Sequence, residues 1–126
     1  MTEDRLHDMF EMRKVFMRSL ADAVPDSGPA EWPLDLSQKK NQRICRDVAL
    51  RGVEEIFEAV QNLKGWKPHR VSDVSDFDRD KFLEEIVDAM NYFFSLLILA
   101  GYSEDDLHAA YIMKDKIITD RLTNGY

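Results

Sequence analysis

The sequence predicts an all-α protein, a bundle of four helices formed by a single domain over residues 1–126. Three observations support this prediction. Apolar residues recur at three- and four-residue steps, no useful stretch alternates as a strand would, and glycine, proline or capping residues separate the helical stretches. With 126 residues, 44% of them hydrophobic, the chain has the size and composition for one packed core.

The first helix is expected over residues 3–23, where apolar side chains recur with helical spacing. Prolines and a glycine follow and stop it, so residues 24–36 are expected to form an ordered arm. A lone tryptophan among prolines usually packs onto something, and Trp32 is therefore expected to anchor this arm. The arm is also long enough to embrace a neighbouring subunit.

The second helix is expected to begin with Ser37 as its N-cap, because serine readily caps a helix with its hydroxyl group. It is expected to end near Leu63 or Lys64, where Gly65 follows as a stop signal. Gly52 lies inside this helix and marks either a weak point or a close approach of another helix.

The third helix is expected over about residues 79–100, after a connector at 65–78 that is rich in serine and aspartate. Asp78 is a suitable N-cap, and Gly101 ends the helix. After Phe82 the helix is apolar on almost every side. A helix of that kind is expected to be buried.

The fourth helix is expected over about residues 104–122, because Ser103 and Asp106 resemble a capping box with aspartate in place of glutamate. Four short helices leave little shelter for a polar site. The bundle is therefore expected to be completed by a partner subunit, in a homodimer or a dimer of dimers.

The overall charge excludes some classes of partner. The chain has 17 basic and 24 acidic residues and a net charge of −7, which argues against non-specific binding to nucleic acid or to an anionic membrane. Cys45 is the one cysteine, and the N-terminus does not resemble a signal peptide, so a reduced cytoplasmic setting is expected. The longest apolar run, Tyr92 to Tyr102, is too short to span a bilayer.

Acidic residues one helical turn apart are the main functional signal. Side chains with this spacing project from one helix face, and antiparallel packing of two such helices would bring at least four carboxylates together. Such a cluster is costly without cations, and hard oxygen donors suit Mg²⁺ or Mn²⁺. The three histidines are not in the Glu-x-x-His register of di-iron bundles. The acids are Glu54, Glu55 and Glu58 in the second helix, and Glu84, Glu85 and Asp88 in the third.

The alternative is a solvated acidic face, which is the usual explanation of a charge run. The third helix weakens it, because Glu84, Asp88, Asn91 and Ser95 form one polar stripe on an otherwise apolar helix. A polar stripe on a buried helix needs partners. The sequence therefore favours a metal site.

The order of these motifs resembles that of the all-α nucleoside triphosphate pyrophosphatases, a superfamily that includes MazG and the dimeric dUTPases. Glu-Glu-x-x-Glu is followed by Glu-x-x-Asp on the next helix. Between them, Leu63 to Lys67 resembles the Phe-Lys-Tyr-Trp stretch of dimeric dUTPases, and Glu84 to Phe93 resembles their Glu-Glu-x-Val-Asp-x-x-His-Phe segment. The end of the chain, from Tyr111 to Tyr126, resembles their Tyr-x-x-Lys … Arg-Gln-x-x-Gly-Tyr tail.

The resemblance implies Mg²⁺-dependent hydrolysis of a nucleoside triphosphate, or its deoxy form, to the monophosphate and pyrophosphate. It implies that Glu55, Glu58, Glu85 and Asp88 hold Mg²⁺, for which Mn²⁺ could substitute. Glu54 would be a further ligand or would position the attacking water, so that the catalytic acids are Glu54, Glu55 and Glu58. Contacts to the triphosphate would come from Lys64, Lys67, Lys114 and Arg121, although surface solvation explains each of them singly. Aromatic residues available to stack on the base are Trp66, Phe16, Tyr92 and Tyr111, although each is also explained as core.

The departures from the dimeric dUTPase pattern concern the base. The positions that usually present glutamine and asparagine to uracil are Arg13 and Met17, and Asn91 replaces a histidine. The asparagines usual in the tail fall at Asp115 and Ile118. We therefore expect a relaxed or purine-preferring enzyme, closer to MazG-like proteins, in which Arg13 and Asn91 lie at the substrate.

Two other classes of function compete with this interpretation. A non-catalytic helical interaction module could present Met9, Met12, Phe16 and Met17 as an adaptable face, although core or dimer interface explains these residues better. A nucleic-acid binder would need a basic cluster, and residues 38–43 offer the one short stretch of this kind.

Overall fold

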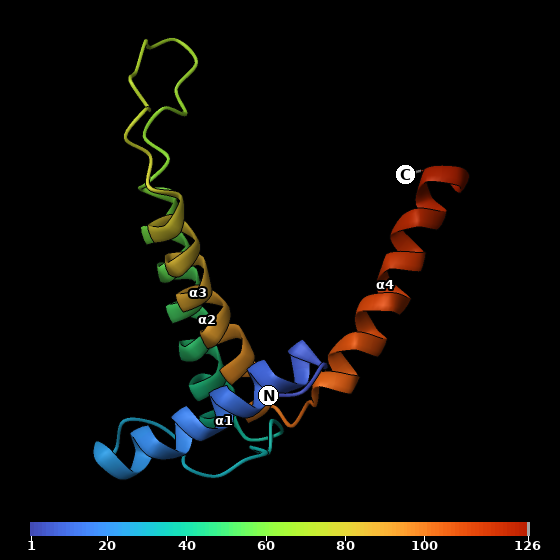
Figure 1. Ribbon diagram of the computed structural model, residues 1–126. Helices are drawn as coiled ribbons and strands as arrows, with labels where there is room; N and C mark the ends of the chain where they lie inside the picture. Colours follow the sequence, from blue (N-terminus) through green and yellow to red (C-terminus); the bar gives the residue numbers. More distant parts are fainter. Residues whose placement is uncertain (126) are drawn as a thin grey trace. The chain divides into compact units, whose positions relative to one another are not determined.

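The computed structural model describes residues 1–125, and its regular structure over that range is entirely helical (Figure 1). This confirms the predicted all-α class with four helices. In the described residues no helix is both long enough and apolar enough to cross a membrane. The helices are α1 (Arg5–Ala23), α2 (Lys39–Val60), α3 (Arg79–Leu99) and α4 (Glu104–Asn124).

The chain divides into two compact units. The first, called the α1–α4 unit, consists of Met1–Pro33 and Leu97–Tyr126. The second, called the α2–α3 unit, is the continuous segment Leu34–Leu96, which contains α2 and most of α3.

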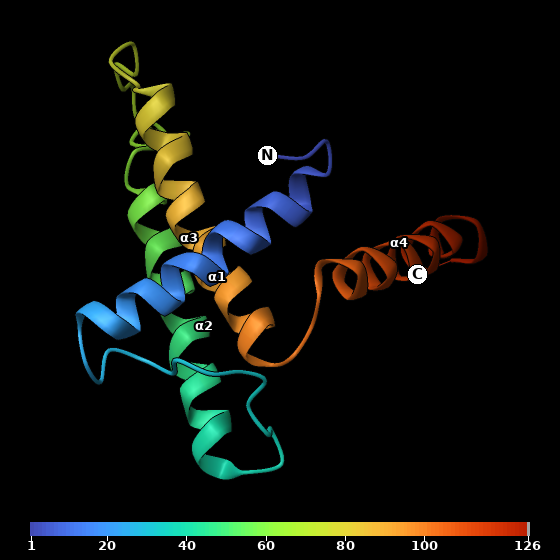
Figure 2. The same cartoon turned by 60° about the horizontal axis from the view of Figure 1, so that its bottom comes forward.

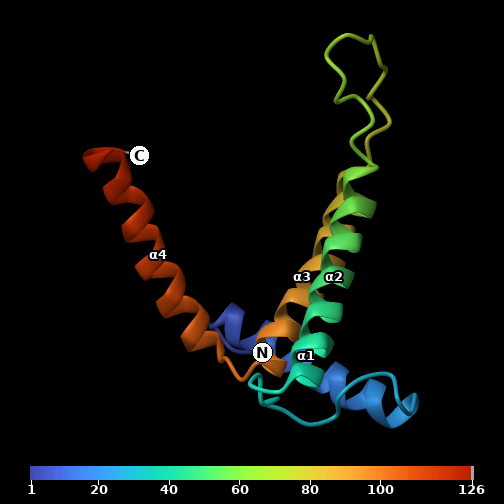
Figure 3. The same ribbon diagram turned by 180° about the vertical axis from the view of Figure 1, so that it is seen from behind.

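In the α2–α3 unit the two helices run antiparallel and side by side, joined at one end by the connector (Figures 1, 2 and 3). Gly52 is buried at the contact between them. A Cβ atom at Gly52 would lie 2.9 Å from Cε1 of Phe93, which is closer than packed carbon atoms come. Of the two interpretations of Gly52, the close approach of another helix is therefore the correct one.

The predicted ends of α2 were wrong by a few residues. The Ser37 hydroxyl and amide both donate to Oδ1 of Asp35, at 2.7 and 3.0 Å, so Ser37 closes a turn and Gln38 stands at the N-cap position. At the other end the helix stops at Val60, before Leu63 and Lys64. Here the side chain of Asn62 donates to the Ala59 carbonyl at 3.1 Å and satisfies one of the last helical acceptors.

The predicted ends of α3 are confirmed. Oδ1 of Asp78 accepts a hydrogen bond from the Lys81 amide at 3.0 Å, which caps the helix start. Gly101 follows the last turn with φ of +91°, a left-handed conformation that favours glycine. A Cβ atom there would also lie 2.8 Å from Cβ of Pro33.

The expectation that α3 is buried on nearly all sides was wrong for its first half. Leu83, Val87 and Met90 are 62%, 44% and 40% exposed. In a hairpin of two helices, each helix can cover only one face of the other, so the remaining apolar faces of α3 stay open. The buried residues of this helix are Ala89, Phe94, Ser95, Ile98 and Leu99.

In the α1–α4 unit, side chains cap the first turns of both helices. Oδ1 of Asp4 accepts from the His7 amide at 3.0 Å and caps α1, and Ser103 and Asp106 form the predicted capping box of α4. The arm is held as expected, because the Arg18 guanidinium lies 4.7 Å from the ring centroid of the half-buried Trp32.

None of the residues described in α4 is buried. Its exposed side chains nevertheless include several large apolar ones. The four-helix bundle and its completion by a partner subunit therefore stay predictions. The exposed apolar residues of α4 are Tyr111, Ile112, Met113, Ile117, Ile118 and Leu122.

Candidate active site

Four predicted metal ligands lie on the two helices of the α2–α3 unit, Glu55 and Glu58 on α2 and Glu85 and Asp88 on α3. Burial raises the pKa of the Glu55 carboxyl, and the charge of Glu58 and a hydrogen bond to Glu58 raise it further. The negative charges of Asp88 and Glu85, on the neighbouring helix, act in the same direction. The charges of these acids therefore interact across the two helices.

The pairing of the helices brings these acids to similar heights along the two helix axes. Gly52 contacts Phe93 at one level, and Nδ2 of Asn62 donates to Oε2 of Glu85 at 2.6 Å at another. Glu58 lies six residues after Gly52, and Asp88 lies five residues before Phe93. At about 1.5 Å of rise per residue, the two acids stand at nearly the same height on antiparallel helices.

The cluster is open to solvent. Glu58 and Asp88 are exposed, whereas Glu55 and Glu85 are half-buried. Among the described residues, these carboxylates are not in a group of three whose ligand atoms all lie within 4.8 Å of one another. The donors are all hard carboxylate oxygens, which fits Mg²⁺ or Mn²⁺.

Two other residues border the cluster. Glu54 is exposed and lies one helical turn before Glu58, so it stands at the edge of the acidic face. Asn62 was not predicted as part of the site. Its amide holds the Glu85 carboxylate, and no spacing in the sequence marks an asparagine just beyond a helix end for this role.

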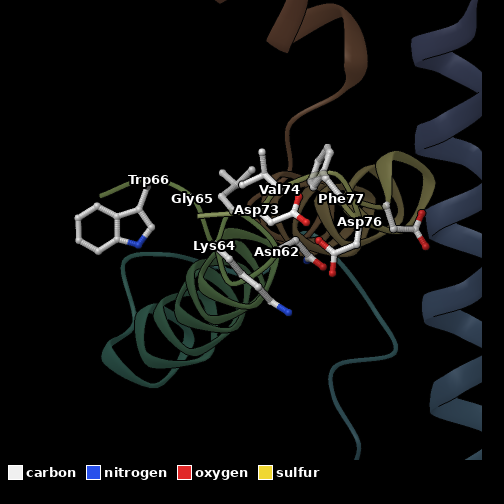
Figure 4. Close-up of a pocket in the computed structure, with 10 residues that line it drawn as sticks. Asn62, Lys64, Gly65, Trp66, Asp73, Val74, Asp76 and Phe77 are labelled. Atoms are coloured by element: carbon white, nitrogen blue, oxygen red, sulfur yellow. The ribbon is translucent and has the colours of Figure 1, made fainter. Parts of the chain in front are cut away.

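A pocket of about 510 Å³ adjoins the cluster, with Asn62 in its lining. The connector between α2 and α3 supplies most of the rest (Figure 4). Two predicted substrate residues, Lys64 and Trp66, belong to it, and in the view of Figure 4 the Trp66 ring lies apart from Asp76 and Phe77. The lining residues are Asn62, Leu63, Lys64, Gly65, Trp66, Asp73, Val74, Asp76, Phe77 and Asp78.

A second pocket, of about 390 Å³, brings cationic side chains together. Lys64 and Lys67, the predicted triphosphate contacts, line it together with Trp66, and Nζ of Lys67 lies 5.4 Å from the centroid of a Trp66 ring. Arg70 also lines this pocket. Arg70 was not predicted from the sequence, although the basic run from Lys67 to Arg70 is the signal that could have identified it.

The remaining predicted residues are divided between the units. Asn91 is half-buried on α3, one turn beyond Asp88. Arg13, Lys114 and Arg121 belong to the α1–α4 unit, where the Arg13 guanidinium lies 4.6 Å from the Phe16 ring centroid. Lys114 and Arg121 are exposed and stand seven residues apart, on the same side of α4. Tyr126, the last residue of the tail motif, lies outside the described residues.

Comparison of the chain with protein-family models, with curated proteins and with solved structures gives no match. The resemblance to the all-α pyrophosphatases therefore rests on the order of the sequence motifs alone.

Proposed function

We propose that the chain is a Mg²⁺-dependent nucleoside triphosphate pyrophosphohydrolase of the all-α superfamily that its motifs resemble. One observation supports this most directly. Glu58, Asp88 and Glu85 all raise the pKa of the Glu55 carboxyl, so acidic charges from two helices interact beside a pocket. A purely solvated acidic face gives no reason for such convergence, since like charges repel.

The acids are proposed to bind the metal ion and to orient the attacking water. Glu55, Glu58, Glu85 and Asp88 would hold Mg²⁺, with Asn62 fixing the carboxylate of Glu85. When bound, the ion would neutralise phosphate charge and lower the pKa of a coordinated water. Glu54, at the edge of the cluster, would accept a hydrogen bond from the attacking water and orient it.

The cationic side chains are proposed to bind the phosphate groups of the substrate. Lys64, Lys67 and Arg70 line one pocket and would stabilise negative charge on the departing pyrophosphate. Water would attack the α-phosphorus in line, and the bond from that atom to the bridging oxygen would break. Lys114 and Arg121 on α4 are assigned to the same leaving group by the resemblance of the tail.

The substrate is proposed to be a nucleoside triphosphate or its deoxy form, with a relaxed or purine-preferring choice of base. Arg13 and Asn91 stand where the dimeric dUTPases present other residues to uracil. A panel of ribo- and deoxyribonucleoside triphosphates with Mg²⁺ or Mn²⁺ tests the proposal. We expect equimolar monophosphate and pyrophosphate, and none with excess chelator. Release of inorganic phosphate, or no product from any triphosphate, would contradict it.

A non-catalytic helical interaction module is the alternative, and one observation favours it. Met9, Met12 and Phe16 are exposed on α1, as an adaptable binding face would require. Calorimetry with Mg²⁺ separates the two functions. The hydrolase should be stabilised by the ion, whereas the module should show no such ligand-dependent shift.

We also propose that the active form is a homodimer or a dimer of dimers. In each unit, large apolar side chains are exposed, on α4 in one unit and at Leu83 and Val87 of α3 in the other. A second copy would cover these side chains and complete the bundle. Light scattering is expected to give at least twice the molar mass of one chain, and a monomer at all working concentrations would refute the assembly.

A further inference from the structure

A second group of possible metal ligands lies in the α1–α4 unit and shares no residue with the proposed active site. Nδ1 of His7, on α1, lies 2.5 Å from Oε1 of Glu104, the first residue of α4. This contact joins the two helices. Glu11 completes the group, since one ligand atom from each of the three residues lies within 4.8 Å of the others.

Local structure positions all three side chains. His7 and Glu11 are four residues apart on α1, so they project from one face of that helix. Glu104 directly follows Ser103, whose capping box with Asp106 fixes the start of α4. The side chain of His7 is 41% exposed and that of Glu104 is 15% exposed, so the group is ordered by its neighbours and still open to an ion.

We propose that His7, Glu11 and Glu104 bind a divalent transition-metal ion of the Zn²⁺ type. An imidazole nitrogen with carboxylate oxygens is a donor set that suits such ions, whereas Mg²⁺ takes oxygen donors. Three protein ligands would leave a fourth tetrahedral position for water. The ion would fasten the beginning of α4 to α1.

Two contacts compete with the ion. A proton shared by His7 and Glu104 satisfies that pair, and Nζ of Lys14 donates to Oε1 of Glu11 at 3.0 Å. Binding must therefore release the histidine proton. It must also either use Oε2 of Glu11 or displace the lysine. A simple ion-pair cluster is the rival explanation, and it predicts no preference for Zn²⁺.

The three histidines of the chain make the test specific. Zn²⁺ is titrated into the full chain with Mg²⁺ in excess, so that the all-oxygen cluster on α2 and α3 is occupied. Imidazole NMR signals and calorimetry are recorded together. We expect one Zn²⁺ per chain at this site, with shifts of the His7 ring signals and unchanged signals from His69 and His108. Zn²⁺ should also raise the melting temperature.

Variants separate loss of the ligand from loss of the fold. His7→Gln should weaken Zn²⁺ binding by more than about tenfold, whereas His69→Gln and His108→Gln, the matched controls, should leave it unchanged. Glu11→Gln should weaken it too, while leaving the hydrogen bond between His7 and Glu104 in place. Glu58→Gln should retain Zn²⁺ binding, so this site stands or fails independently of the hydrolase. Equal affinity in His7→Gln and the natural chain, or no Zn²⁺ binding at all, would overturn the proposal.

Discussion

Replacing Glu58 by glutamine, or Asp88 by asparagine, is expected to lower pyrophosphate release by at least about a hundredfold while the helical fold persists. These two acids stand at nearly the same height on α2 and α3, and both raise the pKa of Glu55. Each substitution keeps the size of the side chain but removes a charged oxygen donor. The measurement is turnover at saturating Mg²⁺, with circular dichroism to confirm the fold.

Two acids on the same helices provide matched controls. Asp47 lies on α2 and pairs at the surface with Arg51 at 3.0 Å, and Asp80 lies exposed in the first turn of α3. Asp47→Asn and Asp80→Asn change the same net charge without touching the cluster, so turnover should stay near that of the natural chain. Pyrophosphate release at the natural rate by Glu58→Gln and Asp88→Asn would refute the assigned metal ligands.

Replacing Glu55 by glutamine is expected to change stability in opposite directions without and with Mg²⁺. The folded protein raises the pKa of Glu55, so its ionised form is disfavoured by folding. The negative charge of Glu55 therefore lowers the free energy of unfolding at neutral pH. This destabilisation diminishes as the pH falls through the raised pKa of the folded state, and it is absent below the usual pKa of the unfolded state. In metal-free buffer, Glu55→Gln removes the loss and should be the more stable chain.

With Mg²⁺ the natural chain should be more stable than Glu55→Gln. A ligand that binds only the folded state stabilises it by about 2.7 kcal/mol at a hundred times its dissociation constant. The natural chain should gain this stabilisation, and Glu55→Gln should gain much less. Urea unfolding followed by circular dichroism, with chelator and then with Mg²⁺, gives both values, and Asp47→Asn serves as the control. Equal stability of Glu55→Gln and the natural chain under both conditions would identify a solvated acidic face.

The helices were largely predictable because their signals are local. Ser103 with Asp106, Asp78 and Gly101 all act within a few residues, and the structure uses each of them as expected. Ser37 misled the prediction because its hydroxyl has a second partner, Asp35, which is equally close in sequence. Spacing alone does not reveal which of two local acceptors or donors a side chain will use.

The burial of α3 was less predictable for a different reason. Its apolar residues after Phe82 predict contact on many sides, but they do not tell which chain makes the contact. Within one chain, α2 covers one face, and Leu83 and Val87 stay exposed. A pattern of apolar residues thus indicates that a face needs a partner and leaves the identity of that partner open.

In the candidate site, the acids could be predicted and their supporting residues could not. Helical periodicity places Glu55 near Glu58, and Glu85 near Asp88, on common faces. Asn62 and Arg70 come from the end of α2 and from the connector, where no period relates position to direction. The proposed choice of base depends on such irregular segments as well. The sequence therefore predicts the type of reaction in more detail than the base of the substrate.

The close approach at Gly52 has a consequence for ion selectivity in the proposed metal site. Because this residue has no side chain, the Phe93 ring can sit against the backbone of α2, and the spacing of the two helices is set there. Oxygen ligands lie about 2.0–2.1 Å from Mg²⁺ and about 2.3–2.6 Å from Ca²⁺, a difference of a few tenths of an ångström. A methyl group at this position would force the Phe93 ring or the backbone of α2 to move. In the proposed metal site, a residue without any donor atom would thus influence how the carboxylates discriminate between a small cation and a larger one.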